Sequence, residues 1–125
     1  MQKIAAIRLR GKFNLKKEVE VTLTLLGLDR KNKCLILKKP TKVDLGMLNK
    51  AKDYITYGEI SENTLKKLLD KKKPNKQTDK KIILRLPNPK KGFKSIKKGY
   101  GQGGDLGYRG DKINELLERI IENIK

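Results

Sequence analysis

The stretch KIAAIRLRGKFNLKKEVEVTLTLLGLDRKNKCLILK, residues 3–38, predicts a strand, a helix and a second strand in succession. Residues 3–10 predict a strand with an apolar face of Ala5, Ile7 and Leu9, while the other face carries Ile4, Ala6, Arg8 and Arg10. Over residues 15–26 they recur at helical spacing, and Asn14 stands before them as a candidate N-cap. Residues 33–38 are apolar at their centre and predict the second strand.

The rest of the chain predicts further helices over residues 44–54 and 62–72, a third strand over residues 82–86, and a final helix that begins at Asp111 as its N-cap. The Tyr57-Gly58 pair between the first two of these helices predicts a turn. Residues 71–81, which are rich in lysine, predict a basic low-complexity surface loop.

This order of elements predicts a single α+β domain over residues 1–125. Strands separated by helices often pair in parallel, but three short strands fit a split arrangement better. We therefore expect a small three-stranded antiparallel sheet, related to the ferredoxin-like split β-α-β fold, with helices packed on one face. A basic Gly-rich loop and the C-terminal helix complete it.

Composition favours a binding protein over an enzyme. The 125 residues include 32 Lys and Arg against 14 Asp and Glu, a formal net charge of +18. Such a surplus repels itself unless a polyanion is near, and nucleic acid is the expected polyanion. The chain has no His and a lone Cys34, so we expect no catalytic site, metal or cofactor, and a buried thiol in a reducing compartment.

The chain is also expected to be soluble and intracellular, without a membrane partner. No apolar run approaches the roughly 20 residues that span a bilayer. The N-terminus lacks the long apolar core of a signal peptide.

Three segments are candidates for contact with phosphates. The first is at the end of the first strand, and a solvated strand edge is its alternative interpretation. It contains Arg8, Arg10, Gly11, Lys12 and Asn14. The second spans residues 90–98, where lysines surround Phe93 and Ile96; these two side chains are alternatively core residues.

The third segment is the Gly-rich stretch over residues 98–110, where Tyr100 and Tyr108 are candidates for stacking on bases. A flexible loop whose glycines only make turns is the alternative. Its G-x-G-x-x-G pattern lacks the strand and helix of a dinucleotide site, so we expect no small-molecule substrate. Eight basic and two acidic residues give residues 85–112 a net charge of +6.

Five blocks then resemble, in the right order, the L-thirty family of large ribosomal subunit proteins in its archaeal and eukaryotic form (L-seven in eukaryotes). They are IRLRGKFN (7–14), LLGLDRKNKC (25–34), GMLNKAKDYITYGEI (46–60), PKKGF (89–93) and GGDLGYRGDKINELL (103–117). Two departures are that the lysine-rich run near Pro74 replaces a longer insertion, and that Lys33 stands where the family often has His.

The resemblance implies a structural, non-enzymatic protein of the cytoplasmic ribosome that supports translation, with large-subunit rRNA and neighbouring ribosomal proteins as partners. A free-standing basic nucleic-acid-binding protein, such as an RNA chaperone or a chromatin protein, is the alternative. The residues and the resemblance together predict these RNA contacts: Arg8, Arg10, Gly11, Lys12, Asn14, Lys33, Lys50, Lys90, Lys91, Gly92, Phe93, Lys94, Lys97, Lys98, Tyr100, Gly103, Gly104, Tyr108 and Arg109.

Overall fold

A computed structural model describes residues 3–9, 16–28, 30–52, 54–71, 76–77, 81–86 and 106–122. Helices and strands alternate along much of this part of the chain. In order they are β1 (Ile4–Arg8), α1 (Lys17–Leu26), β2 (Lys33–Leu37), α2 (Lys42–Lys50), β3 (Ile55–Glu59), α3 (Glu62–Lys71), β4 (Lys76–Gln77), β5 (Lys81–Arg85), β6 (Gly107–Tyr108), the 3₁₀ turn η2 (Gly110–Lys112) and α4 (Ile113–Glu122).

The described strands form one sheet in the order β4-β5-β2-β1-β3-β6. All neighbours pair antiparallel except β3 and β6, which are parallel. The prediction of an α+β fold with an antiparallel sheet is confirmed, but three strands was too few. Strand β3 replaces the turn expected at Tyr57-Gly58, and β4 lies inside the loop expected over residues 71–81.

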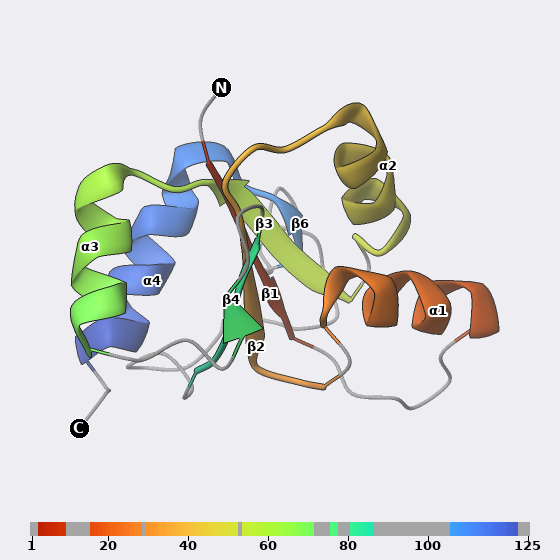
Figure 1. Ribbon diagram of the computed structural model, residues 1–125, viewed down its shortest axis with the longest axis horizontal. Coiled ribbons are helices and arrows are strands. Elements are labelled where there is room, and N and C mark those ends of the chain that lie inside the picture. Colours follow the sequence, from red (N-terminus) through yellow and green to blue (C-terminus); the bar gives the residue numbers. More distant parts are fainter. Residues whose placement is uncertain are drawn as a thin grey trace.

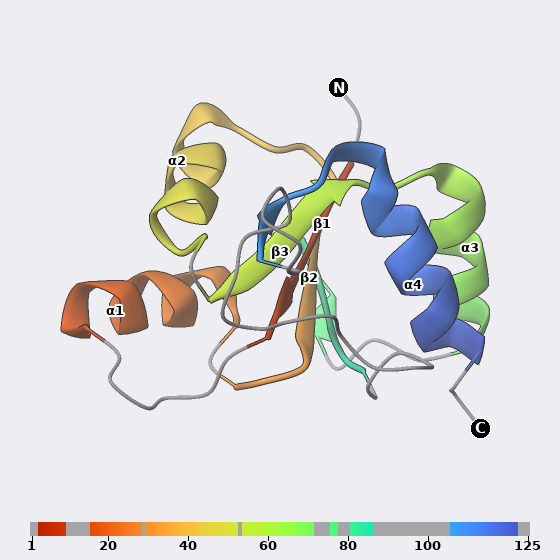
Figure 2. The same cartoon turned by 180° about the vertical axis from the view of Figure 1, so that it is seen from behind.

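Helices cover both faces of the sheet, so the prediction of helices on one face was wrong. Figures 1 and 2 show α1 and α2 on one side of the strands and α3 and α4 on the other. Strand β1 is buried on both faces because both of its faces are apolar: Ala5 and Ile7 pack under α3 and α4, and Ile4 and Ala6 under α1 and α2. A strand buried on both faces shows a continuous apolar run instead of alternation.

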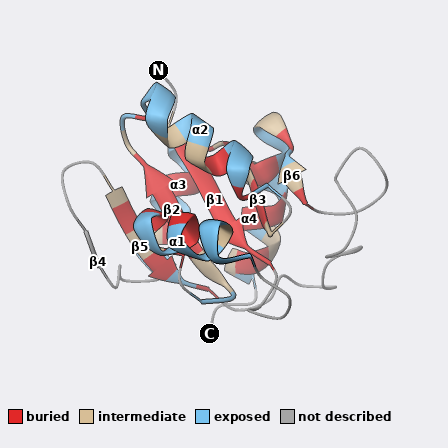
Figure 3. Cartoon of the chain, turned by 90° about the vertical axis from the view of Figure 1, so that its right-hand side faces the viewer, coloured by how far each residue is buried: buried red, intermediate tan, exposed pale blue. Residues whose placement is uncertain are grey.

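Figure 3 shows the resulting separation, with a buried sheet between helices whose outer faces are exposed. The apolar stripes predicted for the helices largely agree with it. Leu23 and Leu26 of α1 and Leu48 of α2 are buried under one layer, and Leu116 and Ile120 of α4 under the other.

Capping explains where α2 begins, two residues before the predicted start. Thr41 Oγ1 accepts a hydrogen bond from the backbone N–H of Asp44 at 3.2 Å, and Asp44 Oδ2 accepts one from the Thr41 N–H at 3.0 Å. This reciprocal capping box satisfies two backbone donors at once. By contrast, α1 begins after Lys16, which makes no side-chain cap, and the predicted cap Asn14 lies outside the described residues.

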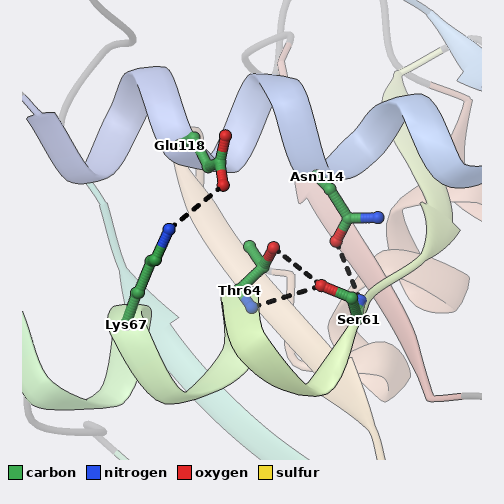
Figure 4. Close-up of polar contacts among 5 residues, drawn as sticks. All are labelled: Ser61, Thr64, Lys67, Asn114 and Glu118. Atoms are coloured by element: carbon green, nitrogen blue, oxygen red, sulfur yellow. Dashed lines mark hydrogen bonds and ion pairs between the residues drawn. The ribbon is translucent and has the colours of Figure 1, made fainter.

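Polar contacts join α3 to α4 across the other layer, as Figure 4 shows. Asn114 Oδ1 accepts a hydrogen bond from the backbone N–H of Ser61 at 2.8 Å, and Lys67 Nζ lies 3.5 Å from Glu118 Oε1. Ser61 also caps α3, since its Oγ accepts from the Thr64 N–H. The predicted cap Asp111 lies within η2, one turn before α4.

Candidate nucleic-acid interface

Three strands begin or end at one end of the sheet, each at a basic residue. β1 ends at Arg8, β2 begins at Lys33 and β5 ends at Arg85. Lys33 lies opposite Arg85 in the β2–β5 register. With Arg30 and Lys31, which are exposed in the turn before β2, these residues define what we call the basic end.

Asn32 links the ends of β1 and β5 through backbone hydrogen bonds. Its backbone N–H donates to the Arg8 carbonyl at 2.9 Å, and its carbonyl accepts from the Leu86 N–H at 2.9 Å. Its φ of 69° is left-handed, a conformation that Asn adopts more readily than most residues. The turn that carries Arg30 and Lys31 is therefore fixed between the ends of β1 and β5.

The residues on either side of the basic segment 87–105 lie at this same end of the sheet, on two different strands. Leu86 follows the end of β5. Leu106 precedes Gly107, which pairs in parallel with Thr56, next to the residue of β3 that lies opposite Arg8. Strands β2, β1 and β3 separate the two attachment points, a distance of about 19 Å at the usual strand spacing. The segment between them therefore joins opposite sides of one sheet end.

Arg8 is among the predicted RNA contacts, but its side chain does not face solvent. The side chain is only 1% exposed, and its Nη1 donates to the Leu28 carbonyl at 2.9 Å. That carbonyl follows the C-terminal end of α1, where a cation is electrostatically favourable. Arg8 therefore holds α1 against the sheet.

Arg109, another predicted RNA contact, is also buried, at 7% exposure. Its Nε donates to Thr56 Oγ1 at 2.8 Å, and its backbone N–H donates to the Tyr57 carbonyl at 2.9 Å. Thr56 Oγ1 in turn donates to the Gly107 carbonyl at 3.1 Å. The side chain therefore fastens the segment after β6 to β3.

Tyr108 is exposed at the outer edge of the sheet. Its hydroxyl donates to Glu59 Oε1 at 2.5 Å, and its ring centroid lies 5.4 Å from that of Tyr57. The hydrogen bond to Glu59, with smaller contributions from burial and nearby negative charge, raises the pKa of Tyr108 to about 12. The phenol is thus held in one orientation, with much of its ring open to a ligand.

Two more predicted contacts lie in the described part of the chain. Lys33 is half-buried at the basic end, whereas Lys50 is exposed at the end of α2, with Nζ 3.9 Å from Glu18 Oε2. The other predicted contacts lie outside the described residues: Arg10, Gly11, Lys12, Asn14, Lys90, Lys91, Gly92, Phe93, Lys94, Lys97, Lys98, Tyr100, Gly103 and Gly104.

Sequence reasoning missed Arg30, Lys31 and Arg85 as interface candidates. Each is exposed, and each lies beside a strand end from which a basic segment departs. The β2–β5 register places Arg85 opposite Lys33, next to the turn that carries Arg30 and Lys31, and no local pattern in the sequence reports that register.

No other type of site stands out among the residues that the structure describes. They include no group of three or more His, Cys, Asp or Glu side chains placed to hold a metal ion. No helix among them is both long enough and apolar enough to cross a bilayer. Cys34 is buried, as predicted, and burial raises the pKa of its thiol to about 12.

Comparison with known proteins identifies the family. The model of the family "Ribosomal protein L30p/L7e" matches residues 4–55. The large ribosomal subunit protein uL30 of Nanoarchaeum equitans is 38% identical, in an alignment that covers 94% of this chain and 97% of that protein. The chain belongs to the uL30 family. The uL30 proteins of Methanosphaera stadtmanae and Thermoplasma acidophilum are 36% and 33% identical, over 94% of this chain in both cases and 99% and 92% of those proteins.

The expected resemblance is thereby confirmed over most of the chain. The matched residues 4–55 contain β1, α1, β2 and α2, and with them the turn of the basic end. The alignment with the N. equitans uL30 spans 152 positions, which exceeds the 125 residues of this chain. This uL30 chain is therefore shorter than that relative within the aligned region, as a missing insertion predicts.

Proposed function

We propose that this chain is a structural component of the large ribosomal subunit, located in the cytoplasm, and that it binds folded rRNA through the basic end. Membership of the uL30 family supports the ribosomal role. The observation that carries the RNA-binding role is that the ends of β1, β2 and β5 meet where Arg30, Lys31, Lys33 and Arg85 gather. The two segments that continue from this end, residues 10–15 and 87–105, hold most of the predicted contacts.

The uneven distribution of charge supports this choice of surface. Helices α3 and α4 together carry five acidic and four basic residues, although the chain as a whole has a net charge of +18. Phosphate contacts come mainly from Lys, Arg and backbone N–H groups. The layer made by α3 and α4 therefore offers little attraction to a polyanion, and the basic end offers much more.

The sheet gives this surface a fixed geometry. Asn32 and Arg8 hold the turn, α1 and the end of β1 in place through backbone carbonyls. A binding surface that is ordered before it meets its ligand loses less entropy on binding. Because the major groove of A-form RNA is deep and narrow, we expect recognition through the sugar-phosphate backbone, 2′-hydroxyls and splayed bases.

Paired charge removal tests this proposal. The double variant Arg30→Gln/Lys31→Gln removes two exposed charges from the basic end, and Lys66→Gln/Lys71→Gln removes two from α3. Affinity for in vitro transcribed large-subunit rRNA is measured over a series of salt concentrations. The basic-end variant is expected to bind more weakly than the wild type. The slope of its log association constant against log salt concentration is expected to be shallower by about two, and the slope of the α3 variant to change much less.

Equal losses in the two variants would contradict a defined interface at the basic end. A duplex DNA of matched length distinguishes the alternative function. A free-standing basic protein would bind the DNA as tightly as the rRNA, whereas the proposed function requires a clear preference for the rRNA.

A further inference from the structure

Helix α2 presents an outer face that the basic end does not include. Leu48 is fully buried against the sheet, and the opposite side of the helix is exposed. Lys42, Gly46 and Lys50 follow one another on that side at intervals of four residues, which places them in one row. Val43 lies beside the row and is 71% exposed. We call these four residues, without Leu48, the α2 outer face.

Nothing in the described part of the chain explains why position 46 is a glycine. A Cβ added there would meet nothing within 4 Å, and Gly46 is not among the glycines with positive φ. At Gly58, by contrast, a Cβ would lie 2.0 Å from the Gly110 carbonyl oxygen. Glycine inside a helix lowers helix stability relative to alanine. A glycine that costs stability and relieves no contact with the described residues indicates that a group beyond them, such as a bound partner, comes close to the helix backbone.

The charge around α2 favours RNA as that partner. Lys38, Lys39, Lys42, Lys50 and Lys52 all belong to α2 or its flanks. Among the described residues 38–52 the acidic side chain is Asp44, and the capping box already engages it. Lys50 is 3.9 Å from the exposed carboxylate of Glu18, a long and solvated pair that a phosphate can replace.

We propose that the α2 outer face is a second RNA-contact surface, on which a ribose-phosphate backbone crosses the helix at Gly46. Lys42 and Lys50 then contact phosphates on the two sides of the crossing, about 12 Å apart along the helix axis. Val43 packs against a ribose. Figure 1 shows α2 at the opposite end of the strands from the point where β1 meets the turn before β2, so this surface is separate from the basic end. The inference rests on the proposed function and assigns it a second site.

Three variants test the inference in binding and in stability. Gly46→Ala adds a single methyl group at the crossing. Gly46→Lys adds a longer side chain together with a positive charge. Asn63→Ala is the control. It also introduces a better helix former at an exposed position, but on α3 and therefore away from the α2 outer face. Each is compared with the wild type in thermal unfolding and in affinity for in vitro transcribed large-subunit rRNA.

Gly46→Ala is expected to raise the Tm by a few degrees and yet to raise the Kd for rRNA roughly tenfold, a change of about 1.4 kcal/mol. Gly46→Lys is expected to raise the Kd at least as much, although it adds a positive charge. Asn63→Ala is expected to leave the Kd unchanged. Opposite effects on stability and affinity at one position indicate close approach of a partner.

Several results would overturn the inference. Wild-type affinity in both Gly46 variants would do so, and so would tighter binding by Gly46→Lys, which indicates long-range attraction alone. A fall in the Tm of Gly46→Ala would show that the fold itself needs the glycine. Normal binding to naked rRNA with loss from assembled large subunits would assign the face to a protein neighbour. Failure of the wild type to prefer rRNA would instead refute the proposed function itself.

Discussion

At the scale of single residues, burial separates arginines that support the fold from those available to a ligand. Arg8 and Arg109 are almost fully buried and donate hydrogen bonds to Leu28 and Thr56, whereas Arg30 and Arg85 are exposed. A buried guanidinium that loses its partner leaves uncompensated polar groups behind, so truncation of a buried arginine costs more than truncation of an exposed one.

Arg109→Ala is therefore expected to lower the free energy of unfolding by about 1–3 kcal/mol, because it leaves Thr56 without its charged donor. Urea denaturation measures the change. Arg30→Ala, in the exposed turn, is the control and is expected to alter stability by less than about 0.5 kcal/mol. Equal stability of the two variants would show that the Arg109 contact does not support the fold.

The contact between Tyr108 and Glu59 predicts how stability depends on pH. Its pKa is raised to about 12 in the folded protein by the hydrogen bond to Glu59, and an unfolded tyrosine titrates near 10. A raised pKa stabilises the protonated form, so the contribution of this pair to stability is complete below about pH 10 and is lost as pH rises from about 10 to about 12.

Ultraviolet titration of phenolate absorbance checks this prediction. We expect a late ionisation near pH 12 that Tyr108→Phe removes and that Glu59→Ala shifts towards lower pH. The account of the Tyr108–Glu59 contact would be wrong if Glu59→Ala left the late step in place.

At the scale of elements, local patterns located α1, α3 and β1 to within about two residues, because each combines a clear apolar period with a turn or a cap. Strand β3 was missed because Gly58, its fourth residue, is typical of a turn. The structure shows a different reason for this glycine: η2 crosses β3 at that point. Since the two segments are about 50 residues apart, no local pattern contains that contact.

Gly58→Ala is expected to destabilise the protein, by about 1–3 kcal/mol, because the new methyl group would collide with the Gly110 carbonyl oxygen. Urea denaturation measures this change. The same substitution at Gly46 is the matched control, since a Cβ there meets nothing within 4 Å. A Gly58→Ala variant as stable as the wild type would mean that η2 does not lie against β3.

At the scale of the whole molecule, composition predicted the class of partner, and topology selected the surface. The charge of +18 indicates a polyanion but does not locate it. The sequence pattern predicted an RNA contact at Arg8 and did not predict contacts at Arg30, Lys31 and Arg85. Strand order and register bring β1, β2 and β5 to one end, and the guanidinium of Arg8 turns into the fold, so we propose the exposed basic residues as the contacts.

The central claim is that this chain is a structural component of the large ribosomal subunit. Its most direct test is sedimentation of native cell extract through a gradient at moderate salt, with quantification of this chain in each fraction by mass spectrometry. The account predicts that the chain migrates with large subunits and whole ribosomes, at one copy for each large subunit. Migration at the top of the gradient, or with DNA, would contradict it.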